Sequence, residues 1–488
     1  MLFNSIEFMV FLPMVIAAYF VLPFRYRWVL LLAASYYFYM QWRPEYIILI
    51  IVSTVIDYVA AIQLDKTEVN WKRKAYLGLS LLVNLGLLFS FKYYNFFSES
   101  VNSVLVSSGN KPMLTASSLL LPVGISFYTF QTLSYTIDIY LRRRKPERHL
   151  GIFALYVSFF PQLVAGPIER SDRLIPQFKE KHDFEWERLI YGGQLMVWGL
   201  FKKMVVADRL AVIVNQVFNN IGIYRGWPLI IGTVAFAFQI YCDFSGYSDI
   251  AIGAAKILGF DLMKNFERPY FSKSIEEFWR RWHISLSTWF RDYVYIPLGG
   301  SRVNKSRVLF NLGITFLVSG LWHGANWTFV VWGAFHGGLL VAERILKPLR
   351  MWVHEKCEGK WWSFVYDIFR VVKTFSLVCI GWVFFRANSM ADALYALNHF
   401  WRDLGTNANY KLLEANLGAQ GFGVTSIRIS VGVLLFLLTI QWFQRRGSFR
   451  LQLKESPLPV RWAVWYSVAF LILLFGVTEN VEFIYFQF

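Results

Sequence analysis

Long apolar runs separated by short polar segments recur along the whole chain. A helix rises about 1.5 Å per residue and must cross about 30 Å of hydrocarbon, so runs of this length predict membrane helices. We predict them near residues 8–24, 28–42, 46–63, 75–91, 118–140, 152–166, 190–207, 229–250, 308–342, 364–385, 429–443 and 462–478. The pattern therefore predicts an all-α integral membrane protein with about 11 to 13 transmembrane or re-entrant helices plus short amphipathic helices.

One of these runs, residues 308–342, contains no formally charged side chain. As a single helix it would measure about 52 Å, which is too long for one straight span. The glycines at 320 and 324 predict instead two short helices that meet at or near His323, or a re-entrant pair, with freed backbone groups facing protein or a water-filled cavity. Because ionisable residues at membrane depth are costly, His323 is a functional candidate.

Composition agrees with a membrane protein, since 56% of the residues are hydrophobic and only 17% are charged. The net charge of +17 does not indicate nucleic-acid binding, because the lysines and arginines lie between the apolar runs. Basic clusters at 72–74, 142–145, 344–350 and 445–461 are expected on the cytoplasmic side. Counting spans from these clusters predicts that both termini are extracytoplasmic.

No repeat, low-complexity segment or long polar linker divides the chain. We therefore predict one polytopic domain, 1–488, that ends in an extracytoplasmic aromatic tail at 479–488. The first apolar run lacks the basic start of a cleavable signal and is expected to be a retained span. The three cysteines are far apart without metal-type spacing, so the sequence predicts neither a disulfide framework nor a metal site.

The largest charged interruption, residues 265–307, contains a predicted amphipathic helix. Ser274 to Glu277 has the form of a capping box, and Pro297 to Gly300 is a stop signal. One helix between them would place an apolar face toward the bundle. That face would consist of Trp279, His283, Leu286, Phe290 and Tyr293.

Two histidines are candidate catalytic residues. His323 could act as a general base that takes a proton from a hydroxyl, and His283 could meet it from the amphipathic helix. The alternative is that either histidine only packs against its neighbours. His336 is predicted to pack or to support another residue, whereas the remaining histidines are expected to face solvent: His149, His182, His354 and His399.

Polar residues also interrupt the run at 229–250, where Asp243, Ser245 and Asp249 lie close together. A buried carboxylate requires a polar cavity, a basic partner or the membrane edge. Ion pairing of these aspartates with Arg280 or Arg281 is as plausible as a direct catalytic role. At the end of the chain, Tyr485 belongs to an aromatic tail that either forms an interfacial belt or presents a nucleophilic hydroxyl.

Four segments together resemble the membrane-bound O-acyltransferase (MBOAT) family, and most closely its bacterial alginate O-acetyltransferase membrane-subunit branch. They are residues 276–293, 320–326, 243–249 and 122–128. The similarity runs from the first residues to the tail. The resemblance implies a ring of helices around a central funnel, with the invariant family histidine at His323 and the second family histidine at His283.

The resemblance also implies a function, namely transfer of acetyl groups from cytoplasmic acetyl-CoA across the bacterial inner membrane for O-acetylation of a cell-envelope polysaccharide. Acetyl-CoA would be a substrate rather than a permanently bound cofactor. The expected partners are membrane lipids and an extracytoplasmic, esterase-like protein, and no nucleic acid is expected. Tyr485 is similar in position to a tyrosine of a small partner in teichoic-acid D-alanylation, which implies an acyl relay.

In this interpretation His323 activates a hydroxyl, while His283 orients the donor, polarises its carbonyl or protonates the departing thiolate. The predicted lining of the funnel is Trp279, Arg280, Arg281, Trp282, Trp322 and Asn326. A competing hypothesis is a proton-coupled transporter or flippase of a lipid or glycan, in which the buried aspartates and histidines relay protons. Release of coenzyme A distinguishes the two, because only the acyltransferase produces it.

Overall fold

The structure of the protein is a computed structural model that describes residues 1–356, 359–444, 453, 455–477 and 483–484. None of these residues forms a β-strand, so the predicted all-α class is confirmed. The chain separates into two compact units, which are described in turn. Unit 1 comprises 1–196 and 250–264, and unit 2 comprises 197–249 and 265–487. The prediction of one domain over 1–488 stays a prediction.

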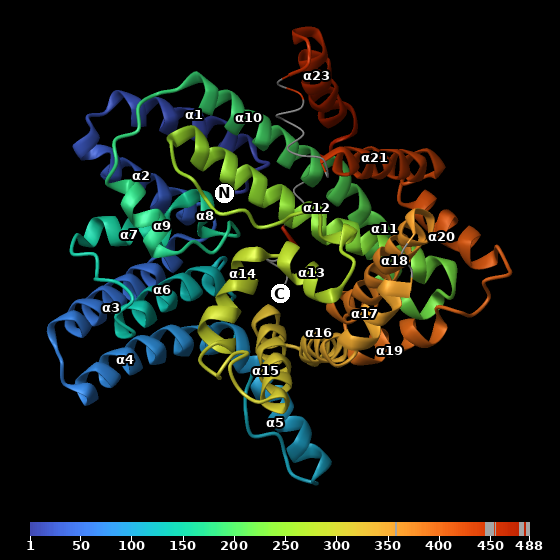
Figure 1. Ribbon diagram of the computed structural model, residues 1–488, viewed down its shortest axis with the longest axis horizontal. Helices are drawn as coiled ribbons and strands as arrows, with labels where there is room; N and C mark the ends of the chain where they lie inside the picture. The colour runs from blue at the N-terminus through green and yellow to red at the C-terminus, as the bar shows by residue number, and fades with distance from the viewer. Residues whose placement is uncertain (357–358, 445–452, 454, 478–482, 485–488) are drawn as a thin grey trace. The chain divides into compact units, whose positions relative to one another are not determined.

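Unit 1 is built from the helices of the first part of the chain. They are α1 (Ile6–Val21), α2 (Phe24–Met40), α3 (Ile47–Lys66), α4 (Asn70–Leu88), α5 (Tyr94–Ser107), α6 (Ile125–Tyr140), α7 (Leu150–Ser158), α8 (Phe160–Leu163) and α9 (Ser171–Phe178). Helices α3, α4 and α6 pack side by side (Figure 1). Their contact surface is polar at its centre, where Asp57 of α3 accepts hydrogen bonds from Asn84 of α4 and Thr136 of α6.

Two further helices, α10 (Trp186–Leu200) and α12 (Trp227–Leu258), contribute residues to both units. Unit 2 otherwise contains α11 (Asp208–Phe218), α13 (Ile275–Arg281), α14 (Ile284–Phe290), α15 (Lys305–His323), α16 (Trp327–Ile345), α17 (Lys347–Lys356), α18 (Lys360–Arg386), α19 (Met390–His399), α20 (Ala408–Ala419), α21 (Val424–Phe443) and α23 (Leu458–Phe475). Two π-helical segments, η3 (Phe201–Ala207) and η6 (Arg291–Tyr295), extend α10 and α14.

Most of the predicted apolar runs lie on helices of the structure, although residues 118–124 are not helical and the run 152–166 is divided between α7 and α8. Six helical segments of the described residues are long and apolar enough to cross a membrane, and a seventh counts if the bent pair α16–α17 forms one span. The six are 44–66, 70–107, 227–258, 361–386, 424–443 and 458–475. The chain is therefore a multi-pass membrane protein. The ring and funnel stay predictions, because they concern how the two units are arranged.

The helix predicted over 275–296 is not continuous, so this prediction was wrong. It breaks at His283, whose φ of +43° lies in the left-handed region. A preceding loop replaces the helical hydrogen bonds at the break. The Ile284 N–H donates to the Asn265 carbonyl, and the Glu267 N–H donates to the Arg281 carbonyl. The break turns the backbone between α13 and α14, so His283 begins a new helix instead of continuing the apolar face of the first.

Candidate active site

The break in the uncharged run occurs directly after His323, as the glycine pattern predicted. His323 is the last residue of α15, and Asn326 caps α16 by accepting a hydrogen bond from the Thr328 N–H at 3.0 Å. The two helices pack closely because Gly320 faces Gly333, where a Cβ on Gly320 would approach the Phe329 carbonyl oxygen to 2.3 Å. Small residues at this contact therefore fix the position of the histidine.

The His323 ring is buried among aromatic side chains and is only 3% exposed. Its centroid lies 4.8 Å from the Trp332 ring, 4.9 Å from the Trp322 ring and 5.3 Å from the Phe385 ring, all in edge-to-face geometry. These three rings come from α15, α16 and α18. The imidazole is thus held in one orientation by packing from three helices.

His283 is fully buried and is held by a polar side chain. Its Nδ1 lies 3.2 Å from the Asn265 Oδ1, which also accepts a hydrogen bond from the Ser285 hydroxyl at 2.9 Å. The Phe244 ring contacts the imidazole edge-to-face at 4.6 Å. An amide oxygen opposite Nδ1 favours the tautomer that carries its proton on Nδ1.

Trp322 brings the two histidines into one site. Its ring lies 4.9 Å from the His323 ring and 6.1 Å from the His283 ring. The sequence predicts that two elements 40 residues apart could meet at these histidines. The structure achieves it through this shared indole.

A cavity of about 1140 Å³ lies beside this histidine pair in unit 2. Its inner wall includes Ser319, which precedes His323 by four residues in α15, and Ile284, which directly follows His283. Residues four apart on a helix are neighbours on one face. The cavity therefore extends to within one helical turn of His323 and to the residue next to His283, although neither imidazole lines it.

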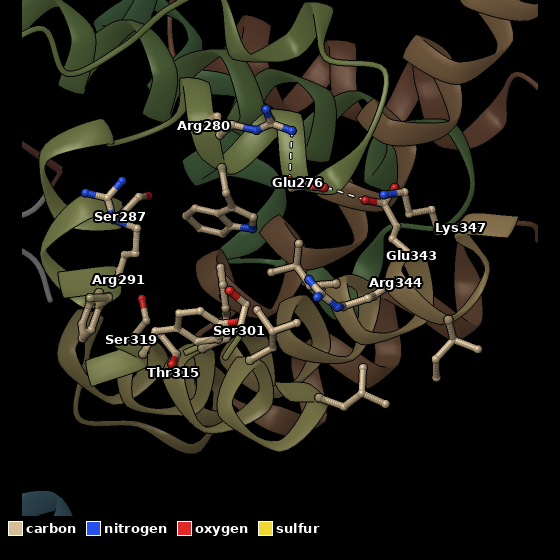
Figure 2. A pocket seen from close by; sticks show the side chains of 18 of the residues that line it. Glu276, Arg280, Ser287, Arg291, Ser301, Thr315, Ser319, Glu343, Arg344 and Lys347 are labelled. Atoms are coloured by element: carbon tan, nitrogen blue, oxygen red, sulfur yellow. Dashed lines mark hydrogen bonds and ion pairs between the residues drawn. The ribbon is translucent and has the colours of Figure 1, made fainter. Parts of the chain in front are cut away.

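Basic side chains predominate among the charged residues that line the cavity. Figure 2 shows Arg280, Arg291 and Arg344 around it, with Thr315 and Ser319 on the wall formed by α15. The two acidic residues of the lining are both engaged: Glu276 pairs with Arg280 at 3.0 Å, and Glu343 accepts the Ile275 and Glu276 N–H groups at 3.1 Å. The full basic set is Arg280, Arg291, Lys305, Arg344, Lys347, Arg350 and Arg370. Such a cavity suits a ligand that carries negatively charged groups.

The predicted lining residues have different positions. Trp279 and Arg280 line the cavity, whereas Arg281 pairs with Glu277. Trp282 is buried against Trp382, with ring centroids 5.0 Å apart. Trp322 does not line the cavity but lies between the two histidines. Asn326 does not line it either, and caps α16.

The two aspartates of α12, Asp243 and Asp249, do not pair with Arg280 or Arg281, which corrects one of the two possibilities considered for them. Asp243 lies 2.9 Å from the Lys203 Nζ, and Asp249 lies 2.8 Å from the Lys202 Nζ. The Lys202 Nζ also donates to the Ser245 hydroxyl at 2.9 Å. Arg280 and Arg281 instead pair within α13, with Glu276 and Glu277.

Three residues of this region were not predicted from the sequence as members of the site. Lys202 and Lys203 lie inside the predicted apolar run 190–207, and that position alone could have identified them as partners for buried acids. Asn265 carries no comparable signal, because an asparagine at the edge of a charged segment is ordinarily a loop residue. The relay candidate Tyr485 lies outside the described residues, whereas Phe483 and Ile484, just before it, are buried.

Comparison with known proteins identifies the class of protein that this site defines. Residues 148–390 match the model of the membrane-bound O-acyltransferase family. The chain belongs to this family and is an O-acyltransferase.

Individual relatives match over most of the chain. The chain is 41% identical over 403 residues to the probable alginate O-acetylase AlgI of Azotobacter vinelandii, covering 80% of this chain and 76% of the relative. It is 37% identical over 514 residues to the probable alginate O-acetylase AlgI of Pseudomonas putida, covering all of both chains. It is also 35% identical over 434 residues to the peptidoglycan O-acetyltransferase of Helicobacter pylori, covering 81% of this chain and 79% of the relative.

Proposed function

We propose that the protein transfers acetyl groups from cytoplasmic acetyl-CoA, across the bacterial inner membrane, for O-acetylation of a cell-envelope polysaccharide. One observation carries the proposal: a basic cavity reaches Ser319, one helical turn before His323, and Ile284, next to His283, and the two histidines share the Trp322 ring. The printed names of the relatives, alginate O-acetylase and peptidoglycan O-acetyltransferase, support a polysaccharide as final acceptor. Both termini are proposed to be extracytoplasmic.

The donor would enter through the cavity. Coenzyme A carries phosphates that match the guanidinium group of Arg344, which can bind them in bidentate geometry. Its thioester arm would then extend toward Ser319 and Ile284. Because these residues separate the cavity from the imidazoles, transfer requires a displacement of this inner wall.

The transfer itself would be carried out by the two histidines. His323 removes the proton of an attacking hydroxyl, whose oxygen then forms a bond to the acetyl carbon. His283, whose Nδ1 is held by Asn265, orients the donor, and the coenzyme A thiolate released as the thioester bond breaks takes up the proton that His323 removed. The attacking hydroxyl would be that of Tyr485, as a relay, or that of an extracytoplasmic esterase-like partner that passes the acetyl group to the polymer.

The proposal is tested by coenzyme A release from purified protein in lipid vesicles, given acetyl-CoA and the acceptor polymer with its extracytoplasmic partner. We expect coenzyme A and acetylated polymer to form in equal amounts. Acetyl-CoA that stays intact while the polymer or a lipid changes sides of the vesicle would contradict acyl transfer and support the transporter hypothesis.

The position of the donor is tested by the kinetics of a cavity variant. In Arg344→Ala, loss of one charged phosphate contact should raise KM for acetyl-CoA about tenfold, with kcat little changed. Arg302→Ala is the matched control, because Arg302 is exposed and does not line the cavity. An equal effect of both substitutions would place the donor elsewhere.

A further inference from the structure

The chain returns to the interior of unit 2 after its last helix. Arg209 donates to the Phe475 carbonyl at 2.8 Å, and the Val477 N–H donates to the Met204 carbonyl at 3.0 Å. Phe483 and Ile484 are then buried again, with exposed fractions of 1% and 3%. The end of the chain is thus anchored before and after residues 478–482.

The Phe483 side chain is bound by aromatic residues of α12. Its ring centroid lies 4.7 Å from the Tyr247 ring and 5.7 Å from the Phe244 ring. Phe244 and Tyr247 are three residues apart and share a face of the helix. Since the Phe244 ring also contacts the His283 ring at 4.6 Å, Phe483 lies one side chain away from a candidate catalytic histidine.

A buried carboxylate binds the backbone next to it. The Ile484 N–H donates to the Asp243 Oδ2 at 2.7 Å. The Asp243 Oδ1 lies 2.9 Å from the Lys203 Nζ, which in turn lies 2.8 Å from the Asp208 Oδ1. A hydrogen bond to an ionised acceptor is roughly twice as strong as a neutral one. The lysine therefore fixes the carboxylate so that its second oxygen faces the returning chain.

From these contacts we infer that Asp243, Phe244 and Tyr247 form a docking site on α12 for the protein's own C-terminal segment, with Asp243 as a positioning residue. The inference rests on the proposed function and deepens it, because Tyr485 directly follows the anchored Ile484 in the sequence. The ionic cluster Lys203, Asp208 and Asp243 then serves to hold the segment that carries the relay tyrosine. This role explains why the carboxylate is kept at a buried position.

The docking is tested in the full-length protein by photocrosslinking. The photoreactive residue p-benzoylphenylalanine replaces Tyr247, and the irradiated protein is cleaved after glutamates. Cleavage after Glu482 releases the peptide 483–488. We expect this peptide to be recovered attached to α12. Recovery of crosslinks only to other parts of the chain would overturn the inference.

Variants of Ile484 separate a specific hydrogen bond from general packing. Ile484→Pro lacks the N–H donor, so docking should weaken about tenfold and the crosslink yield should fall. Ile484→Val keeps the donor and should crosslink as the wild type does. Pro at this position does not remove the ion pair of Asp243 with Lys203, and a wild-type melting temperature of the variant shows that unit 2 stays folded. Equal yields from the two variants would overturn the role of Asp243.

A charge control on the same helix completes the test. Asp249→Asn removes a carboxylate that pairs with Lys202 and not with the tail, so its crosslink yield should equal that of the wild type. The crosslink needs neither acetyl-CoA nor acceptor. A protein that docks its tail but releases no coenzyme A therefore refutes the proposed function alone. Wild-type polymer acetylation by Ile484→Pro, with its crosslink lost, refutes the positioning role alone.

Discussion

Two carboxylates, Asp57 in unit 1 and Asp243 in unit 2, are both buried in helices of a membrane protein but are stabilised in different ways. The described donors to Asp57 are neutral: Asn84 donates to its Oδ2 at 2.8 Å, Thr136 donates to its Oδ1 at 3.2 Å, and Ser80 also donates to Oδ1. Asp243 instead pairs with Lys203, and its other oxygen accepts the backbone N–H of Ile484.

The difference separates a structural from a functional use of a buried acid. All donors to Asp57 come from α4 and α6, so its hydrogen bonds join adjacent helices of one bundle. Asp243 binds a residue 241 positions away in the sequence, next to a candidate catalytic histidine. Substitutions at the first site should therefore lower stability alone, and substitutions at the second should also change the position of the tail.

The largest effect is expected when the cation between two acids is removed. Lys203→Ala leaves Asp208 and Asp243 buried with no shared lysine, so the free energy of unfolding should fall by about 3–5 kcal/mol. Thermal unfolding in detergent measures it. Lys203→Arg, which keeps the charge, is the control. A melting temperature equal to that of the wild type would show that the ionic cluster does not stabilise unit 2.

A smaller loss is expected at the neutral network. Asp57→Ala leaves the donors of Ser80, Asn84 and Thr136 without their acceptor and should cost about 1–3 kcal/mol. KM for acetyl-CoA and the crosslink between α12 and the tail should not change. A changed KM would mean that the two carboxylates are not as different as their contacts indicate.

The smallest effect is expected for Asp249→Asn. The Asp249 side chain is 23% exposed, and its partner Lys202 keeps a hydrogen bond to Ser245. Solvent screens such a pair, so its loss should cost less than about 1 kcal/mol. Thermal unfolding of this variant is measured under the same conditions as that of Lys203→Ala. An equal loss of unfolding free energy in the two variants would contradict the expectation that the more buried ion pair stabilises more.

Much of the architecture was predictable because membrane helices need long apolar runs. The break at His323 was predicted from an uncharged segment too long for one span. The break at His283 was not, since the capping signal at Ser274 and the apolar periodicity favour one helix. That periodicity reports only local preference, and the loop at Asn265 and Glu267 supplies the hydrogen bonds that interrupt the helix.

The residues of the candidate site were predictable where their chemistry is unusual in an apolar environment. His283, His323, Asp243 and Asp249 stand out in this way. Their partners do not stand out in the sequence, because ion pairing depends on how the helices pack. Lys203 lies within a predicted apolar run, and the two aspartates that it pairs with come from separate helices. The cavity likewise gathers residues from 276 to 370, which no local pattern connects.

The most direct test of the account is polymer acetylation from labelled acetyl-CoA by the His323→Ala variant, compared with the wild type at equal amounts of folded protein in the membrane. We expect the label on the polymer to be lost, because the hydroxyl no longer has its general base. Label transferred at the wild-type rate would contradict the central role of His323.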